Sequence, residues 1–155
     1  MITAKEIMTE KVITVTKDAS IKKLSDLFIQ YKVNGFPVVD GDEKLIGIVT
    51  EKNLIEQSKN LHIPTVIALF DAVIYLESDK KFEAEVKRYS ATQVEDIYTS
   101  NVVTISPDTG IHEIASLMAE KGVHSIPVVD GKNILGIVGK LDIIRGLAQG
   151  GSSQE

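Results

Sequence analysis

The chain has 155 residues, of which 43% are apolar, a formal net charge of −5 and no cysteine. That length allows one ordinary domain or two small ones with a real core. The missing cysteines exclude disulfides, thiolate metal sites and a cysteine nucleophile, and the acidic balance argues against a general nucleic-acid-binding surface. No signal peptide and no apolar run near the roughly 20 residues of a spanning helix are visible, so we expect a cytoplasmic protein with no membrane partner.

The first predicted strand covers residues 12–15, which are rich in β-branched side chains. A helix follows, with Asp18 and Ser20 as candidate N-cap residues and with Asn34 and Gly35 at its expected end. Its apolar residues recur at three- and four-residue spacing and therefore share one face. They are Ile21, Leu24, Leu27, Phe28 and Tyr31.

A hairpin is expected next, with strands over residues 36–39 and 45–50 and a turn at Asp40 and Gly41. Pro37 cannot donate a hydrogen bond to a neighbouring strand, which favours an edge or strand-start position. A second helix over residues 51–58 completes a β-α-β-β-α unit.

Residues 59–96 have no counterpart elsewhere in the chain. An apolar segment over residues 65–76 precedes a polar helical stretch over residues 79–89, with three apolar residues on one face: Phe82, Val86 and Tyr89. We interpret the whole stretch as a connector that docks over the two halves of the chain and extends a subunit interface, in preference to a lid or a membrane anchor.

The second half of the chain repeats the first. Pro127 follows Pro37 by 90 residues, whereas Gly136 follows Gly47 by 89, as a single deletion in a turn would give. Predicted strands cover residues 102–105, 126–129 and 134–138, and predicted helices cover residues 111–118 and 140–147. The tail, residues 150–155, is expected to be disordered.

Two units of this kind carry a proline in the contexts VNGFPVVD and VHSIPVVD and a later GIVTEKN or GIVGKLD. Together they resemble a tandem pair of cystathionine-β-synthase (CBS) domains, the Bateman module. The resemblance assigns residues 1–58 to repeat 1, residues 59–96 to the connector and residues 97–149 to repeat 2. It implies an α+β (mixed α/β) fold with the repeats packed about a pseudo-twofold axis, two equivalent clefts between them, and a homodimer.

The resemblance also implies a ribose-phosphate corner in each repeat, with a serine or threonine three residues before an aspartate or asparagine. In the first copy the Thr50 hydroxyl is expected to donate to phosphate and the Asn53 carbonyl to accept from ribose. The second copy has no hydroxyl at Gly139, so phosphate there depends on backbone amides or Lys140. Asp142 is a charged and therefore stronger acceptor for the ribose diol.

The wall that faces each corner is expected, from the same resemblance, to come from the other repeat. The first cleft then combines Ile48, Thr50 and Asn53 with Thr99, Val103, Val123 and His124. The second combines Ile137, Gly139 and Asp142 with Thr9, Ile13, Val33 and Asn34. A simpler explanation stays open for several of these residues, because Thr50 and Asn53 also suit an N-cap pair and His124 suits an exposed loop.

The sequence shows no phosphate loop, calcium loop, metal-binding histidine spacing or nucleophile elbow, so we expect neither an enzyme nor a required cofactor or metal. The leading hypothesis is a free-standing regulatory sensor that binds AMP, ADP, ATP or S-adenosylmethionine and signals to an unidentified effector protein. A constitutive dimeric scaffold is the first alternative. A nucleotide-acting enzyme and a local nucleic-acid-binding protein are less favoured.

Overall fold

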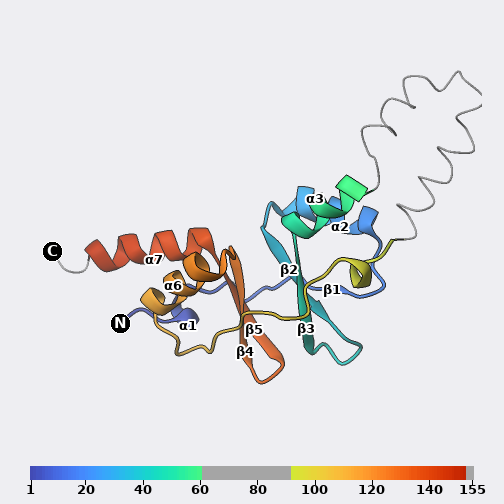
Figure 1. Ribbon diagram of the computed structural model, residues 1–155. Helices are drawn as coiled ribbons and strands as arrows, with labels where there is room; N and C mark the ends of the chain where they lie inside the picture. The colour runs from blue at the N-terminus through green and yellow to red at the C-terminus, as the bar shows by residue number, and fades with distance from the viewer. Residues whose placement is uncertain (61–91, 153–155) are drawn as a thin grey trace, which may run out of the picture.

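The computed structural model describes residues 1–60 and 92–152, which form two sheets that lie side by side (Figure 1). In the first sheet β2 (Gly35–Val39) lies between β1 (Val15–Thr16), which is parallel to it, and β3 (Leu45–Thr50), which is antiparallel. The second sheet is the antiparallel hairpin of β4 (Ser125–Asp130) and β5 (Asn133–Gly139). The predicted connector elements over residues 65–76 and 79–89 lie outside the described residues.

Each hairpin is framed by helices, as the repeat predicts. The described helices are α1 (Ala4–Ile7), α2 (Ile21–Tyr31), α3 (Glu51–Asn60), the 3-10 helix η2 (Val94–Asp96), α6 (Ile111–Lys121) and α7 (Lys140–Ser152). The mixed helix and strand content and the two repeated units are confirmed. Among the described residues no helix is long and apolar enough to cross a bilayer.

The ends of α2 are set by one predicted and one unexpected residue. Ser20 caps the start, because its side chain accepts a hydrogen bond from the Lys23 amide at 3.1 Å. Asp18 does not cap the helix and instead accepts from the Thr16 hydroxyl. The expectation that Asn34 and Gly35 end the helix is wrong, since it ends at Tyr31, and its C-cap Lys32 adopts a left-handed conformation with φ of 52°.

The first strand of each repeat is shorter than predicted. The strand expected over residues 12–15 reduces to Val15–Thr16, and the segment 102–105 forms a single bridge between Ile105 and Val128 rather than a strand. The β-branched residues that prompted the prediction, such as Val12 and Val103, line clefts between the repeats instead. A high strand propensity indicates residues that suit a half-buried surface. The wall of a cleft provides such a surface as well as a β-sheet does.

The proline strand β2 is central in its sheet, and β4 has β5 on one side and the single Ile105 bridge on the other. The Pro127 carbonyl accepts from the Ile105 amide at 3.1 Å, so both the carbonyl and the ring nitrogen of Pro127 face the short Ile105 bridge. The missing donor therefore costs the β4–β5 hairpin no hydrogen bond. Pro37 is equivalent, since the pairing between β1 and β2 begins only at Val38.

The chain past Leu147 continues the last helix to Ser152, so residues 150–152 of the expected disordered tail are helical, whereas residues 153–155 lie outside the described residues. Its glycines weaken a helix in isolation, but here packing retains the helical conformation. A methyl group at Gly146 would meet the Ile111 side chain at 2.5 Å, and one at Gly150 would meet Ile2 at 3.5 Å.

The segment that leads into each repeat packs on the opposite repeat. Around α1, Ala4, Ile7 and Met8 join the core formed by α6, β4, β5 and α7, and Figure 1 shows the blue α1 beside α6 and α7. Around η2, Val94 and Tyr98 join the core formed by α2, β2 and β3. The two lead-in segments are thus exchanged between the repeats.

Paired backbone hydrogen bonds fix this exchange. Thr99 bonds Ile48 on β3 in both directions, at 2.9 and 2.8 Å, and Thr9 bonds Ile137 on β5 at 2.9 and 3.0 Å. Thr9 matches Thr99, and Ile48 matches Ile137, in the repeat. The two contacts therefore join equivalent residues of the two repeats, as contacts related by a twofold rotation axis do.

Candidate functional site

Two clefts lie between the repeats, one beside the start of α3 and one beside the start of α7. The first cleft has a volume of about 450 Å³ and the second about 530 Å³. Both volumes fall within the roughly 300 to 1,000 Å³ of typical small-molecule sites. Cleft walls come from both repeats, because the exchanged lead-in segments run along them.

The structure brings together the residues that the sequence predicts for each cleft. The first cleft contains all seven of its residues: Ile48, Thr50, Asn53, Thr99, Val103, Val123 and His124. The second cleft also contains all seven: Thr9, Ile13, Val33, Asn34, Ile137, Gly139 and Asp142. Asn34 lines the first cleft too. Their proximity is a finding, whereas their roles toward a ligand stay predictions.

In the first cleft Thr50 and Asn53 form a reciprocal cap at the start of α3. The Asn53 Oδ1 accepts from the Thr50 amide at 2.9 Å and from the Thr50 hydroxyl at 3.0 Å, while the Asn53 amide donates to the Thr50 hydroxyl at 3.3 Å. Oδ1 has two lone pairs, and both are used. The Asn53 Nδ2 lies 3.5 Å from the Thr99 hydroxyl, across the join between the repeats.

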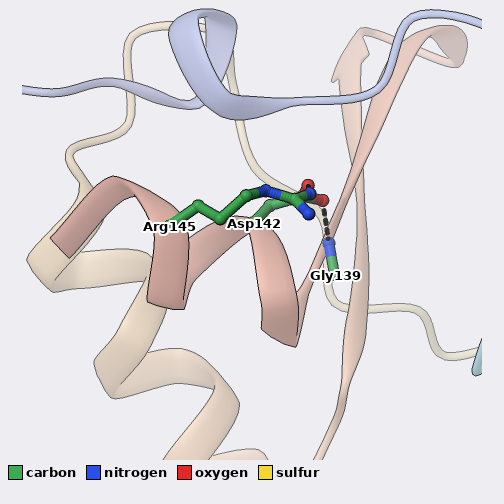
Figure 2. Close-up of polar contacts among 3 residues, drawn as sticks. All are labelled: Gly139, Asp142 and Arg145. Carbon is green, nitrogen blue, oxygen red and sulfur yellow. Dashed lines mark hydrogen bonds and ion pairs between the residues drawn. The ribbon is translucent and has the colours of Figure 1, made fainter. Parts of the chain in front are cut away.

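In the second cleft Asp142 occupies the matching place in the repeat, and Figure 2 shows its side chain beside Gly139 and Arg145. Its Oδ2 accepts from the Gly139 amide at 2.8 Å and its Oδ1 accepts from Arg145 at 2.5 Å. The Asp142 side chain is 11% exposed and that of Arg145 is 67% exposed. The pair therefore places a nearly buried carboxylate beside a cation that remains open to solvent.

The two corners differ in what they can still accept. An ionised carboxylate offers about four lone-pair positions, and the two contacts of Asp142 leave about two of them unused. By contrast, both lone pairs of the Asn53 Oδ1 already accept from the amide and hydroxyl of Thr50. The second corner is thus the better prepared to accept hydrogen bonds from a ligand diol.

A family model for the CBS domain matches the chain twice, at residues 4–60 and 94–149. The chain belongs to the CBS-domain family. It is 31% identical over 151 residues to MJ1426, an uncharacterized protein of Methanocaldococcus jannaschii, with 92% of this chain and 89% of that one covered. Further curated relatives are longer, and the chain spans between 22% and 42% of their length.

Solved structures share the arrangement of this CBS pair. The CBS domain pair of the protein MJ0100, solved with 5′-methylthioadenosine and S-adenosyl-L-methionine, has a TM-score of 0.69 at 24% identity and covers 96% of this chain and 98% of that one. CBSX2, solved with AMP, has a TM-score of 0.71 at 22% identity, with the same coverage. At these identities the likeness shows the fold alone. The expected tandem CBS fold is confirmed.

Several charged residues that line the CBS clefts were not predicted from the sequence. Lys11, Lys32 and Arg145 line the second cleft, and Glu56 and Lys121 line the first. Arg145 was detectable, because it follows Asp142 by three residues on a predicted helix and such residues are neighbours on the helix surface. Lys11 and Lys32 gave no such signal, since they lie outside the repeated corner and reach the cleft only through the fold.

His124 lies in the first CBS cleft as predicted, with its side chain exposed. Its carbonyl accepts from the Lys140 amide at 3.2 Å, just as the Asn34 carbonyl accepts from the Glu51 amide at 3.2 Å. These bonds fix the starts of α3 and α7 against the residues just before β2 and β4. Among the described residues no group of three or more His, Cys, Asp and Glu side chains is arranged to hold a metal ion.

Proposed function

We propose that this CBS pair is a regulatory, non-catalytic module that binds an adenosine-containing ligand, with the second cleft as its principal site. The observation that carries the proposal is Asp142, a nearly buried carboxylate with unused acceptor positions in a cleft of about 530 Å³. A diol is the group such a carboxylate binds well, because both hydroxyls donate to a charged acceptor.

The rest of the cleft suits the other parts of a nucleoside. Ile13, Val33 and Ile137 give apolar walls for a base. Lys140 and Arg145 offer cations for a phosphate or carboxylate. The solved relatives with AMP, and with 5′-methylthioadenosine and S-adenosyl-L-methionine, favour an adenosyl ligand. AMP, ADP, ATP and S-adenosylmethionine are therefore the candidates.

Regulation follows from the position of the cleft. Val33 and Asn34 lie between α2 and β2 of the first repeat, whereas Ile137 and Asp142 belong to the second repeat, so a ligand in the cleft would contact both. Such a ligand favours whichever arrangement of the repeats it contacts better, and only this difference in affinity drives a change. An effector protein that senses the arrangement would receive the signal.

Thermal unfolding with AMP, ADP, ATP, S-adenosylmethionine and GTP tests the proposal. A ligand at about 100 times its dissociation constant stabilises the native protein by roughly 2.7 kcal/mol, which raises the melting temperature by several degrees. We expect an adenosine ligand to produce this shift and Asp142→Ala to lose most of it. Each variant is compared with its own ligand-free melting temperature, because a lost cap lowers stability by itself.

Asn53→Ala is the matched variant in the first cleft, and it should retain the shift that the second cleft provides. No shift with any adenosine compound would favour a constitutive scaffold. Equal shifts in wild type and Asp142→Ala would move the principal site away from the second cleft. An equal shift with GTP would contradict the preference for adenosine.

We also propose that the module forms a homodimer through α3 and α7. Ile55 on α3 and Ile144 on α7 occupy matching places in the two repeats and are 69% and 59% exposed. A second copy of the chain would bury this apolar surface. We expect Ile55→Glu with Ile144→Glu to yield a monomer by light scattering, while Ile29→Glu on α2, 74% exposed, should not. A monomeric wild-type protein would refute the dimer.

A further inference from the structure

The two clefts are built from matching positions but carry different charge. Among the described residues, four basic side chains and one carboxylate line the second cleft: Lys11, Lys32, Lys140, Arg145 and Asp142. The first cleft has two basic and two acidic side chains besides His124: Lys52, Lys121, Glu51 and Glu56. The lysine, arginine, aspartate and glutamate side chains of the second cleft thus sum to a formal charge of +3, whereas those of the first sum to zero.

The difference arises at repeat-matched positions. Lys140, the first residue of α7, corresponds to Glu51, the first residue of α3, and Arg145 corresponds to Glu56 one turn later. The substitutions therefore reverse charge at the same two places of the same corner. Packing does not dictate either sign, because all four side chains are exposed.

Two of the lysines sit where local structure disfavours them. A cation at the start of α7 opposes the helix dipole, whereas Glu51 at the start of α3 agrees with it. Lys32 adopts a left-handed conformation with φ of 52°, and its counterpart is Gly122, with φ of 64°. Residues whose charge or backbone conformation is locally unfavourable, and which gain no compensating contact, are typical of functional positions.

The corner at Gly139 also leaves space. A methyl group built on Gly139 would meet no atom nearer than the Asp142 Oδ2 at 3.7 Å, so a β-carbon would fit there. Packing therefore does not impose the glycine. Its effect is to leave room beside Lys140 and Arg145, where a larger anionic group can lie.

We propose that the second cleft selects nucleotides by phosphate number, binding ADP or ATP more tightly than AMP or adenosine, whereas the first cleft gains nothing from added phosphates. The inference rests on the proposed function and names the ligand class of that same site. Each phosphate adds negative charge near Lys32, Lys140 and Arg145 in the second cleft. In the first cleft the same charge would approach Glu51 and Glu56.

Calorimetric titration with adenosine, AMP, ADP and ATP, without magnesium and at two salt concentrations, tests the inference. For the wild-type protein we expect the tightest site to bind ATP at least about tenfold more tightly than adenosine, as one or more charge-assisted contacts would give. Because salt screens exposed charges, high salt should reduce this ratio. Lys140→Glu combined with Arg145→Gln should abolish it.

Glu51→Lys combined with Glu56→Arg is the reciprocal variant, which gives the first cleft the charges of the second. It should create a second site whose affinity rises with phosphate number. The salt dependence is measured on the wild-type protein, so the inference stays testable if a variant does not fold.

The outcomes separate the two proposals. If no adenosine compound binds, the proposed function and this inference both fall. If adenosine binds as tightly as ATP, if salt leaves the ratio unchanged, or if the folded Lys140→Glu and Arg145→Gln variant keeps the preference for ATP, the inference is overturned and the proposed function stands. If the reciprocal variant folds and gains no phosphate-dependent site, the inference is likewise overturned.

Discussion

At the scale of single residues, the hairpin turns show how one side chain can shape a contact between repeats. The Asp40 Oδ1 accepts from the Asp42 amide at 2.9 Å and from the Lys44 amide at 3.0 Å. The loop so formed contacts the other hairpin, because the Leu45 amide donates to the Lys132 carbonyl at 2.9 Å. Lys44 also donates to the Asn133 side chain. Asp40 thus orders a turn that joins the two repeats.

The Asp40 carboxyl should make stability depend on pH. The Lys44 amide, and to a lesser extent the Asp42 amide, lower its pKa in the folded chain. The unfolded chain therefore takes up the proton at a higher pH, and the stabilisation is lost as pH falls through the folded-state pKa. Urea unfolding across this acidic range should show a smaller pH dependence for Asp40→Asn than for wild type. Identical curves would contradict this role.

At the scale of elements, two glycines allow the exchanged lead-in segments to lie against the sheets. A methyl group at Gly47 on β3 would lie 2.2 Å from the Tyr98 ring and 2.6 Å from the Thr99 carbonyl oxygen. At Gly136 on β5 it would lie 2.5 Å from the Met8 sulfur and 3.0 Å from the Thr9 carbonyl oxygen. The glycine of the repeated motif is therefore needed for close approach between backbones.

Gly47→Ala should lower the free energy of unfolding by about 1 to 3 kcal/mol, the usual cost of overpacking. The reason is that the Thr99 carbonyl belongs to the backbone and cannot turn away. Urea unfolding should show a lower midpoint with an unchanged slope. Gly41→Ala is the control, since a methyl group there meets nothing within 4 Å. Equal midpoints for Gly47→Ala and wild type would refute the close-packing argument.

These elements also show what the sequence could predict. Hairpins and helices were predictable because they depend on local patterns that occur twice, such as the apolar face of α2 and the turns after Asp40 and Asp130. The strand over residues 102–105 was overpredicted, since its β-branched residues serve a cleft wall. The left-handed Lys32 was missed because lysine gives no signal of that conformation, although its counterpart Gly122 does.

The clefts were predictable only in part, for a similar reason. Their corners lie within the repeated motif, and the opposite walls came from the family resemblance. Lys11 and Lys32 lie outside the motif, and only the fold brings them beside Asp142. The spacing of residues along the sequence does not indicate which distant residues the fold brings together.

At the scale of the whole molecule, the exchange makes the repeats interdependent. Ala4, fully buried, completes the core of the second repeat, and Val94, also fully buried, completes that of the first. Each core therefore needs residues from two segments that are far apart in the sequence. Loss of one repeat would remove an apolar segment from the other, so the two should not unfold separately.

The described part of the chain should therefore unfold in one cooperative transition. In scanning calorimetry without ligand, the calorimetric and van't Hoff enthalpies should agree, as they do for a two-state protein. Gly136→Ala should lower the midpoint of that single transition rather than split it. Two resolved transitions, one of them unaffected by the substitution, would show that the repeats unfold independently.

The exchange also orders events during synthesis. Residues around Ala4 leave the ribosome before the surface they cover, which is formed by α6, β4, β5 and α7. At about 5 to 20 residues per second, the first apolar segment waits several seconds for its partner. The second repeat can close only when both ends of its core are present, so its folding has to wait until α7 has been synthesised.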